Sequence, residues 1–181
     1  NQIEAEFTKS DNEQEMFFLK KDFEDLILKK FQVKFYKIDI TKLTPNYKPP
    51  ILNEKNQIFS AYLDLNNLLI DNINEKALKG LLRKYIKPEE LKGLRGLKLF
   101  ELFLKEILKY NDYSSLVSPL FVLNDLRQLK GHLKNRSFNK IYLSCKTRIG
   151  IHKDAEHLDV FKELIKSIIR MFETLNSRIT E

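Results

Sequence analysis

Apolar side chains recur at helical spacing over most of this chain. Leu19, Phe23 and Ile27 lie four residues apart and predict a helix over residues 16–30. The same kind of spacing predicts helices over residues 57–73, 75–85, 97–110, 118–133 and 154–178. Pro88, followed by two acids, is also typical of a helix start. The pattern therefore indicates a protein that is mostly helical.

Three stretches depart from this periodicity. Residues 31–40 alternate between apolar and polar side chains, which predicts a strand with one buried face. Residues 41–56 contain three prolines, which remove backbone donors and forbid helix, so we expect a linker or an extended arm there. Residues 135–147 are polar and basic apart from a short apolar patch at 141–143. We predict no regular element for this last stretch.

These segments divide the chain near residue 55. We expect a mainly α protein with a four- to five-helix bundle, preceded by a small mixed α/β lobe. The lobe and its linker would cover residues 1–55, and the bundle residues 56–181. A chain of 181 residues is long enough to bury a core without disulfides or a structural metal.

Composition narrows the class of protein further. No apolar run approaches the ~20 residues that a membrane-spanning helix needs, which excludes a transmembrane protein. The single cysteine, Cys145, excludes a disulfide-built secreted fold and suits a reducing cytoplasm, where we expect the protein. The chain opens at Asn1 without a methionine. We therefore expect a part of a longer protein, with a partner domain or partner protein on its N-terminal side.

Positive charge is concentrated in the middle of the chain. The net charge is +7, and residues 76–153 carry 18 bases against 6 acids, while both flanking parts are slightly acidic. No acid occurs between Leu126 and Lys153. Such a stretch favours polyanionic partners, although a plain solvated surface is the alternative. The bases that we expect to contact nucleic acid are Lys130, Lys134, Arg136, Lys140, Lys146, Arg148 and Lys153.

Most sequence motifs for enzyme chemistry are absent. The five glycines have no phosphate-loop spacing, and no paired cysteines or His-x-x-x-His pair occurs. His152 and His157 are five residues apart, which does not place two ligands on one helix face. No serine or cysteine lies in a nucleophile-elbow context. We therefore expect neither a metal nor a cofactor.

The segment from Ser118 to Asn135 carries the most informative pattern. On a helix, four apolar side chains form a stripe at Val122, Leu126, Leu129 and Leu133, and polar residues lie opposite. Arg127 and His132 are five residues apart, about 140° around an unbroken helix. They converge on one target only if the helix loosens or ends at Gly131.

Residues 124–132, Asn-Asp-Leu-Arg-Gln-Leu-Lys-Gly-His, resemble the Arg-x(4–6)-His signature of HEPN domains, the higher-eukaryote and prokaryote nucleotide-binding helical modules. The helix order over residues 57–178 resembles theirs as well. Members are four- or five-helix bundles that commonly form dimers. Many are metal-independent endoribonucleases of toxin–antitoxin and antiviral systems, whereas others have lost catalysis and bind partners.

The resemblance implies roles for individual residues. Arg127 and His132 would be the catalytic pair, acting on RNA in a homodimer. Gln128 and Gly131 depart from the usual choices of the family. The supporting residues would be Asn124, Asp125, Gln128 and an acid in an earlier helix, Glu101, with Glu106 as the second choice.

This assignment is chemically reasonable. A histidine with a pKa near 6.5 exchanges protons at neutral pH, and an arginine fork forms charge-assisted bonds to a phosphate. Two alternatives stay open. The chain is then either a catalytically inactive module for dimerisation or for binding nucleic acid or a partner, or a helical module in which the Arg–His spacing is a coincidence.

Overall fold

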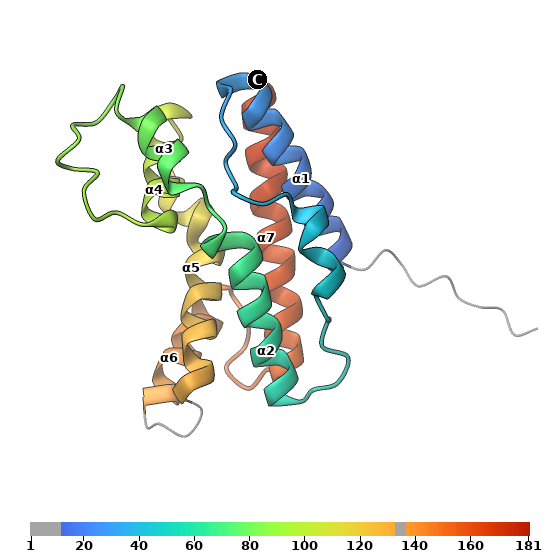
Figure 1. Ribbon diagram of the computed structural model, residues 1–181. Coiled ribbons are helices and arrows are strands. Elements are labelled where there is room, and N and C mark those ends of the chain that lie inside the picture. The colour runs from blue at the N-terminus through green and yellow to red at the C-terminus, as the bar shows by residue number, and fades with distance from the viewer. Residues whose placement is uncertain (1–11, 133–136) are drawn as a thin grey trace, which may run out of the picture.

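Helices make up most of the described molecule (Figure 1). The computed structural model describes residues 12–132 and 137–181, and of His132 only the backbone. The body consists of longer helices, namely α1 (Asn12–Phe31), α2 (Lys55–Asn66), α5 (Tyr113–Leu129), α6 (Ser137–Arg148) and α7 (His157–Thr180). Two short helices, α3 (Glu75–Leu82) and α4 (Gly96–Leu102), lie at one end. The mainly α class predicted from the sequence is confirmed.

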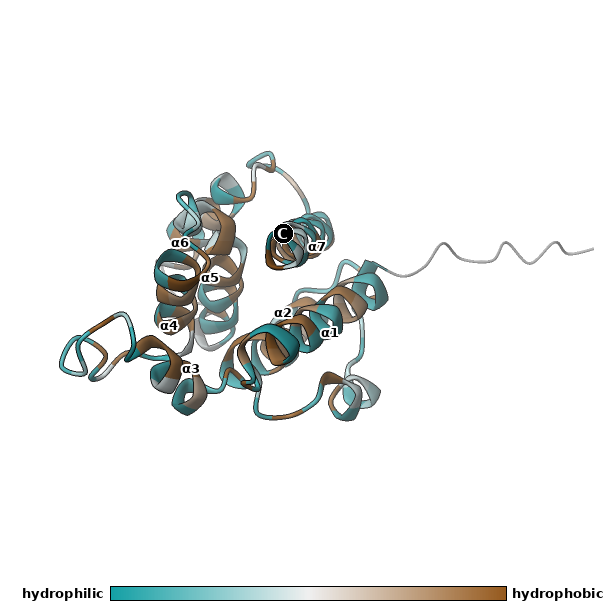
Figure 2. Cartoon of the chain, turned by 90° about the horizontal axis from the view of Figure 1, so that it is seen from above, coloured by the Kyte–Doolittle hydropathy of each residue, from teal (hydrophilic) through white to brown (hydrophobic). Residues whose placement is uncertain are grey.

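Helix α7 is the central element of the bundle. It packs against α1, α5 and α2, and seen from above α5 lies to its left while α1 and α2 lie below it in the view (Figure 2). Helix α6 packs on the outer side of α5. Within the described residues, no helix combines the length and apolar character needed to cross a membrane.

A cluster of phenylalanine rings joins elements that are far apart in the sequence. The ring centroid of Phe23 in α1 lies 4.9 Å from that of Phe35 and 5.7 Å from that of Phe172 in α7. Phe35 also lies 4.8 Å from Phe100 in α4. All four rings are buried, so α1 and the segment around Phe35 share one core with the helices that follow.

The strand predicted over residues 31–40 is wrong. Its only sheet contact in the described chain is an isolated antiparallel bridge between Tyr36 and Ile73. Phe35 and Tyr36 are consecutive, yet both are buried, because other elements cover this segment on both sides. The hydroxyl of Tyr36 donates to the carbonyl of Leu69 (3.2 Å). The expected mixed α/β lobe is therefore not found over residues 12–55, and residues 1–11 lie outside the described part.

Several predicted helix boundaries also differ. Helix α5 begins at Tyr113, so Pro119 lies inside it instead of opening it. Residues 87–92 form consecutive turns and no helix. Helix α6 was not predicted, although Phe138, Tyr142 and Cys145 lie at helical spacing and are buried. At its far end, α5 stops at Leu129 and tightens into a 3-10 turn, η5 (Lys130–His132).

Two helices widen into π-helix at their C-terminal ends. Helix α2 continues as η3 (Asn67–Asp71), and α4 continues as η4 (Phe103–Ile107). Such π turns are rare and occur often at functional sites. The π turn after α2 brings the side chains of Asn66 and Asp71 within 3.0 Å of each other. This end of α2 faces α5, where the predicted site residues lie.

Candidate functional site

Arg127 lies in the last turn of α5 and reaches across to the end of α2. Its Nη2 is 3.6 Å from Oδ2 of Asp71, and its side chain remains 35% exposed. The Nε of Arg127 is buried and has no hydrogen-bond partner among the described residues. A separation of 3.6 Å is an ion pair and is longer than a good hydrogen bond. The guanidinium is thus positioned by one carboxylate but is not enclosed by it.

Asp71 itself is held by a buried amide. The Nδ2 of Asn66 donates to the same Oδ2 of Asp71 (3.0 Å). Asn66 is completely buried, and its Oδ1 has no partner in the described part of the chain. Together, Asn66, Asp71 and Arg127 form a polar cluster that joins the π turn after α2 to α5. We call it the Arg127 cluster.

A second cation near the end of α5 contacts the middle of α2, apart from this cluster. Lys130 follows Arg127 by three residues, and its Nζ donates to Oγ of Ser60 (3.2 Å). Lys130 is exposed. Two positive groups near the end of α5 therefore lie against polar positions of α2 and its extension. An arginine fork and an ammonium are each able to bind the oxygens of a phosphate, and here their contacts lie eleven residues apart, at Asp71 and Ser60.

The other residues predicted around Arg127 have separate partners. Asp125 forms an ion pair with Arg148 of α6 (2.5 Å), and this pair joins α5 to α6. Glu101 pairs with Lys98 in its own helix (2.6 Å), and Glu106 lies near two lysines. Gln128 is exposed and Asn124 is half-buried. The carboxylate that contacts Arg127 is thus Asp71, which the sequence analysis did not single out.

The predicted nucleic-acid contacts are also divided by their surroundings. Lys140 and Lys153 are exposed. Lys146 is buried, and its Nζ donates to the carbonyls of Lys153 (2.7 Å) and Ala155 (2.8 Å). Its charge therefore holds the loop between α6 and α7 and is turned away from solvent. Lys134, Arg136 and the side chain of His132 lie outside the described residues.

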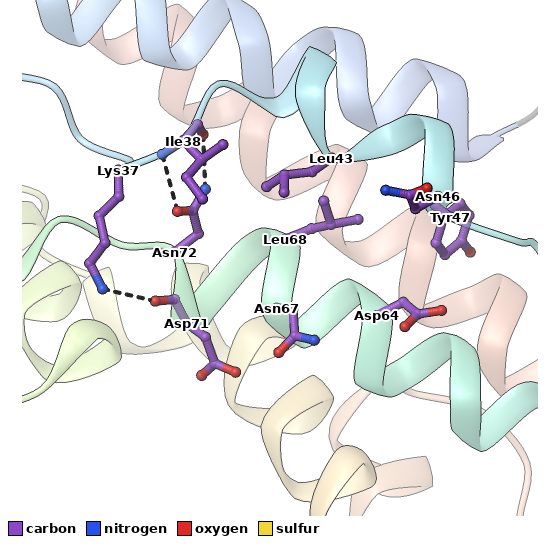
Figure 3. A pocket seen from close by; sticks show the side chains of 10 residues that line it. All are labelled: Lys37, Ile38, Leu43, Asn46, Tyr47, Asp64, Asn67, Leu68, Asp71 and Asn72. Atoms are coloured by element: carbon purple, nitrogen blue, oxygen red, sulfur yellow. Dashed lines mark hydrogen bonds between the residues drawn. The ribbon is translucent and has the colours of Figure 1, made fainter.

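A cavity of about 400 Å³ opens beside the Arg127 cluster, between α2 and the arm of residues 32–54 that joins α1 to α2 (Figure 3). Asp71 stands at one end of it. The arm is fixed to α2 by Asn72, whose Nδ2 donates to the carbonyl of Ile38 (2.8 Å) and whose Oδ1 accepts from the amide of Ile38 (3.1 Å). Lys37 donates to the carbonyl of Asp71 (3.2 Å). The cavity thus has a fixed wall and mixed polar and apolar sides.

His157 and Cys145 have the features of packed side chains. The Nδ1 of His157 lies 2.7 Å from the hydroxyl of Tyr142, and burial, with smaller effects of Lys55 and Lys146, lowers the His157 pKa. Burial, with the nearby Asp125, raises the pKa of Cys145 to about 11, so the thiol is neutral and poorly nucleophilic. Among the described side chains, no group of three or more His, Cys, Asp or Glu could hold a metal ion.

Comparisons with family models, with curated proteins and with solved structures gave no match to this chain.

Proposed function

We propose that the chain is a HEPN-like, metal-independent endoribonuclease module in which Arg127 and His132 act on RNA phosphodiesters. The observation that carries the proposal is the setting of Arg127. Its guanidinium is anchored by Asp71, stays 35% exposed, and lies in the turn of α5 before the 3-10 turn that contains His132. The wider basic region of residues 76–153 would attract the polyanionic substrate.

The proposed reaction needs a base, an acid and a cation. The imidazole of His132 takes the proton of a ribose 2′-hydroxyl, and the freed oxygen attacks the adjacent phosphorus. The phosphorus–O5′ bond breaks, and the leaving oxygen takes up a proton, which gives a 2′,3′-cyclic phosphate and a 5′-hydroxyl. Arg127 stabilises the charge that grows on the phosphate oxygens. A homodimer, which the resemblance implies, would supply a second imidazole as the acid.

Asp71 would set the position of the guanidinium before RNA binds. Both charges of this ion pair are partly exposed, and pairs of that kind contribute only about 0–1 kcal/mol. A phosphodiester can offer two oxygens to the arginine fork and so compete with one carboxylate. Arg127 would therefore exchange Asp71 for phosphate at little cost.

Cleavage of a mixed RNA pool tests the proposal. Arg127→Ala and His132→Ala should each lower the cleavage rate by about 10²- to 10⁴-fold, because each removes a group that acts in the transition state. Activity should survive a chelator, and the products should carry 2′,3′-cyclic phosphate ends. Matched controls are Arg178→Ala, which removes an exposed arginine paired with Glu181, and His152→Ala, which removes an exposed histidine. Both controls should cleave at the wild-type rate.

No cleavage by the wild type, or equal cleavage by the wild type and His132→Ala, would overturn the nuclease proposal. One observation favours a second function, that of a catalytically silent module that binds RNA or a partner protein. The carboxylate of Asp71 already forms an ion pair with Arg127 and therefore competes with a substrate phosphate. This second function predicts salt-sensitive binding with no turnover.

A further inference from the structure

The segment between α3 and α4 stands away from the helical bundle. Figure 1 shows residues 83–95 as a long loop that projects beyond the ends of both helices, and the view from above shows the same projection (Figure 2). We call α3 and this loop, residues 75–95, the α3 projection. It does not overlap with the bases between residues 130 and 153 that the sequence analysis assigned to nucleic acid.

The α3 projection is strongly basic. Residues 75–95 contain seven bases and three acids, a balance of +4 in a chain whose net charge is +7. Arg95 forms an ion pair with Glu75 (3.5 Å). Within the described chain, the other bases have no ion pair and no side-chain hydrogen bond. These six are Lys76, Lys79, Arg83, Lys84, Lys87 and Lys92.

The loop is anchored where it joins the helices, although its lysine and arginine side chains face solvent. Leu91 is buried, and Ile86 and Leu94 pack against the core. Glu75, the first residue of α3, accepts a hydrogen bond from the amide of Gly96 (3.1 Å), the first residue of α4. The two ends of the projection are thus joined, and the cations stand on an ordered support. A preordered surface loses less conformational entropy when it binds a ligand.

An exposed aromatic ring lies among these charges. Tyr85 is 52% exposed, and Nζ of Lys109 lies 5.7 Å from the centroid of its ring. Cations interleaved with an exposed ring are typical of surfaces that bind single-stranded nucleic acid, where phosphates meet the cations and a base stacks on the ring. An anionic membrane fits less well, because peripheral membrane binding needs exposed apolar side chains. In the projection, Tyr85 is the sole large apolar residue that is exposed.

We propose that the α3 projection is a binding surface for single-stranded RNA. Lys84, Lys87 and Lys92 contact the phosphates, and the ring of Tyr85 stacks against a nucleobase. The inference rests on the proposed function only in the choice of RNA as the partner. It does not require that Arg127 or His132 cleaves the strand.

Binding of a fluorescent 20-nucleotide oligouridine, followed by anisotropy, tests this surface. The full chain carries Arg127→Ala throughout, so that no cleavage disturbs the titration. The loop triple variant Lys84→Gln, Lys87→Gln and Lys92→Gln should raise Kd about tenfold at 0.1 M salt. The slope of log Kd against log salt should fall by about 2, because single strands release about 0.7 counterion per phosphate contact.

A second triple variant has the same net charge and serves as the matched control. It replaces three exposed lysines that lie outside the projection and have no ion pair in the described structure, Lys29, Lys162 and Lys166, with glutamine. This control should bind within about twofold of the parent. Tyr85→Leu should raise Kd about fivefold or more and leave the salt slope unchanged, because stacking releases no counterions.

Three results would overturn the inference. They are wild-type affinity in the loop triple, equal weakening by the two triples, and loop-dependent binding to phosphatidylserine vesicles without binding to oligouridine. The proposed nuclease function fails separately. If the chain with Arg127 does not cleave RNA but the loop triple variant binds RNA more weakly, the binding surface is supported and the nuclease proposal is overturned. If it cleaves RNA and the loop triple variant binds RNA with unchanged affinity, the nuclease proposal is supported and the binding surface is overturned.

Discussion

At the scale of single residues, the Arg127 cluster depends on a partner that the sequence does not reveal. The resemblance to the Arg-x(4–6)-His signature singled out Arg127, and the structure confirms that the apolar stripe of Val122, Leu126 and Leu129 in the same helix is buried. Asp71 follows a run of apolar residues and carries no motif. It meets Arg127 because α2 ends in a π turn, and helical periodicity cannot show such a turn in advance. The expected acid, Glu101, instead pairs within its own helix.

His157 gives a prediction about acid sensitivity. Burial lowers its pKa in the folded chain, whereas an unfolded histidine titrates near 6.5. Below that pH the unfolded chain therefore binds more protons, so the free energy of unfolding falls as pH decreases from about 6.5 toward the folded pKa. His157→Gln should reduce this dependence. Urea unfolding at several pH values between 5 and 8 measures it, and the slope with pH should be flatter in the variant.

The hydrogen bond between His157 and Tyr142 affects stability in a different way from the titration. Its loss would lower stability at every pH, whereas the titration of His157 changes only the slope. His152→Gln is the matched control, since this ring is exposed. A slope that is unchanged in His157→Gln, or equally reduced in His152→Gln, would contradict the assignment.

At the scale of elements, periodicity was a good guide where a helix has one buried face. The helix predicted over residues 154–178 is observed as α7 at His157–Thr180, with its apolar stripe buried. Periodicity failed where burial is two-sided or small. Residues 31–40 looked like a strand because their apolar positions alternate, but helices cover both sides, and within residues 12–132 and 137–181 no neighbouring strand pairs with them. Helix α6 was not predicted, because its buried face is short and lies among basic residues.

Two glycine substitutions should change the free energy of unfolding in opposite directions, because Gly96 is closely packed and Gly80 is not. A Cβ on Gly96 would lie 3.3 Å from the carbonyl oxygen of Ile70 and 3.3 Å from Cβ of Ile73. Backbone cannot easily move away, so Gly96→Ala should lower the free energy of unfolding by about 1–3 kcal/mol. Gly80 lies inside α3 with nothing within 4 Å of an added Cβ. Gly80→Ala should therefore stabilise the chain by about 0.5–1 kcal/mol.

Urea unfolding of both glycine variants measures these two effects. A stabilised Gly96→Ala variant would mean that α4 and the turn before α3 do not approach as closely as the structure shows. The same experiment reports on the α3 projection, because Gly96 is one of the two residues that join its ends.

At the scale of the whole molecule, the phenylalanine cluster makes the arm after α1 part of the main core. The sequence suggested a boundary near residue 55 because three prolines and a change of pattern occur there. Local pattern does not show which distant side chains meet, and here Phe35 meets rings of α1 and α4. A shared core predicts that residues 12–55 and the later helices unfold together.

Phe35→Ala tests this cooperation. The ring is buried and contacts Phe23, Phe100 and Phe103, so its loss should lower the free energy of unfolding by about 3–5 kcal/mol. Native-state hydrogen exchange then reads the loss separately in α1 and in α5. Because one core holds both helices, their most protected amides should lose protection by the same factor. Phe18→Ala removes an exposed ring of α1 and should change stability by less than about 0.5 kcal/mol. If α1 loses protection while α5 keeps it, the arm and α1 form a separate unit, and the boundary near residue 55 is real.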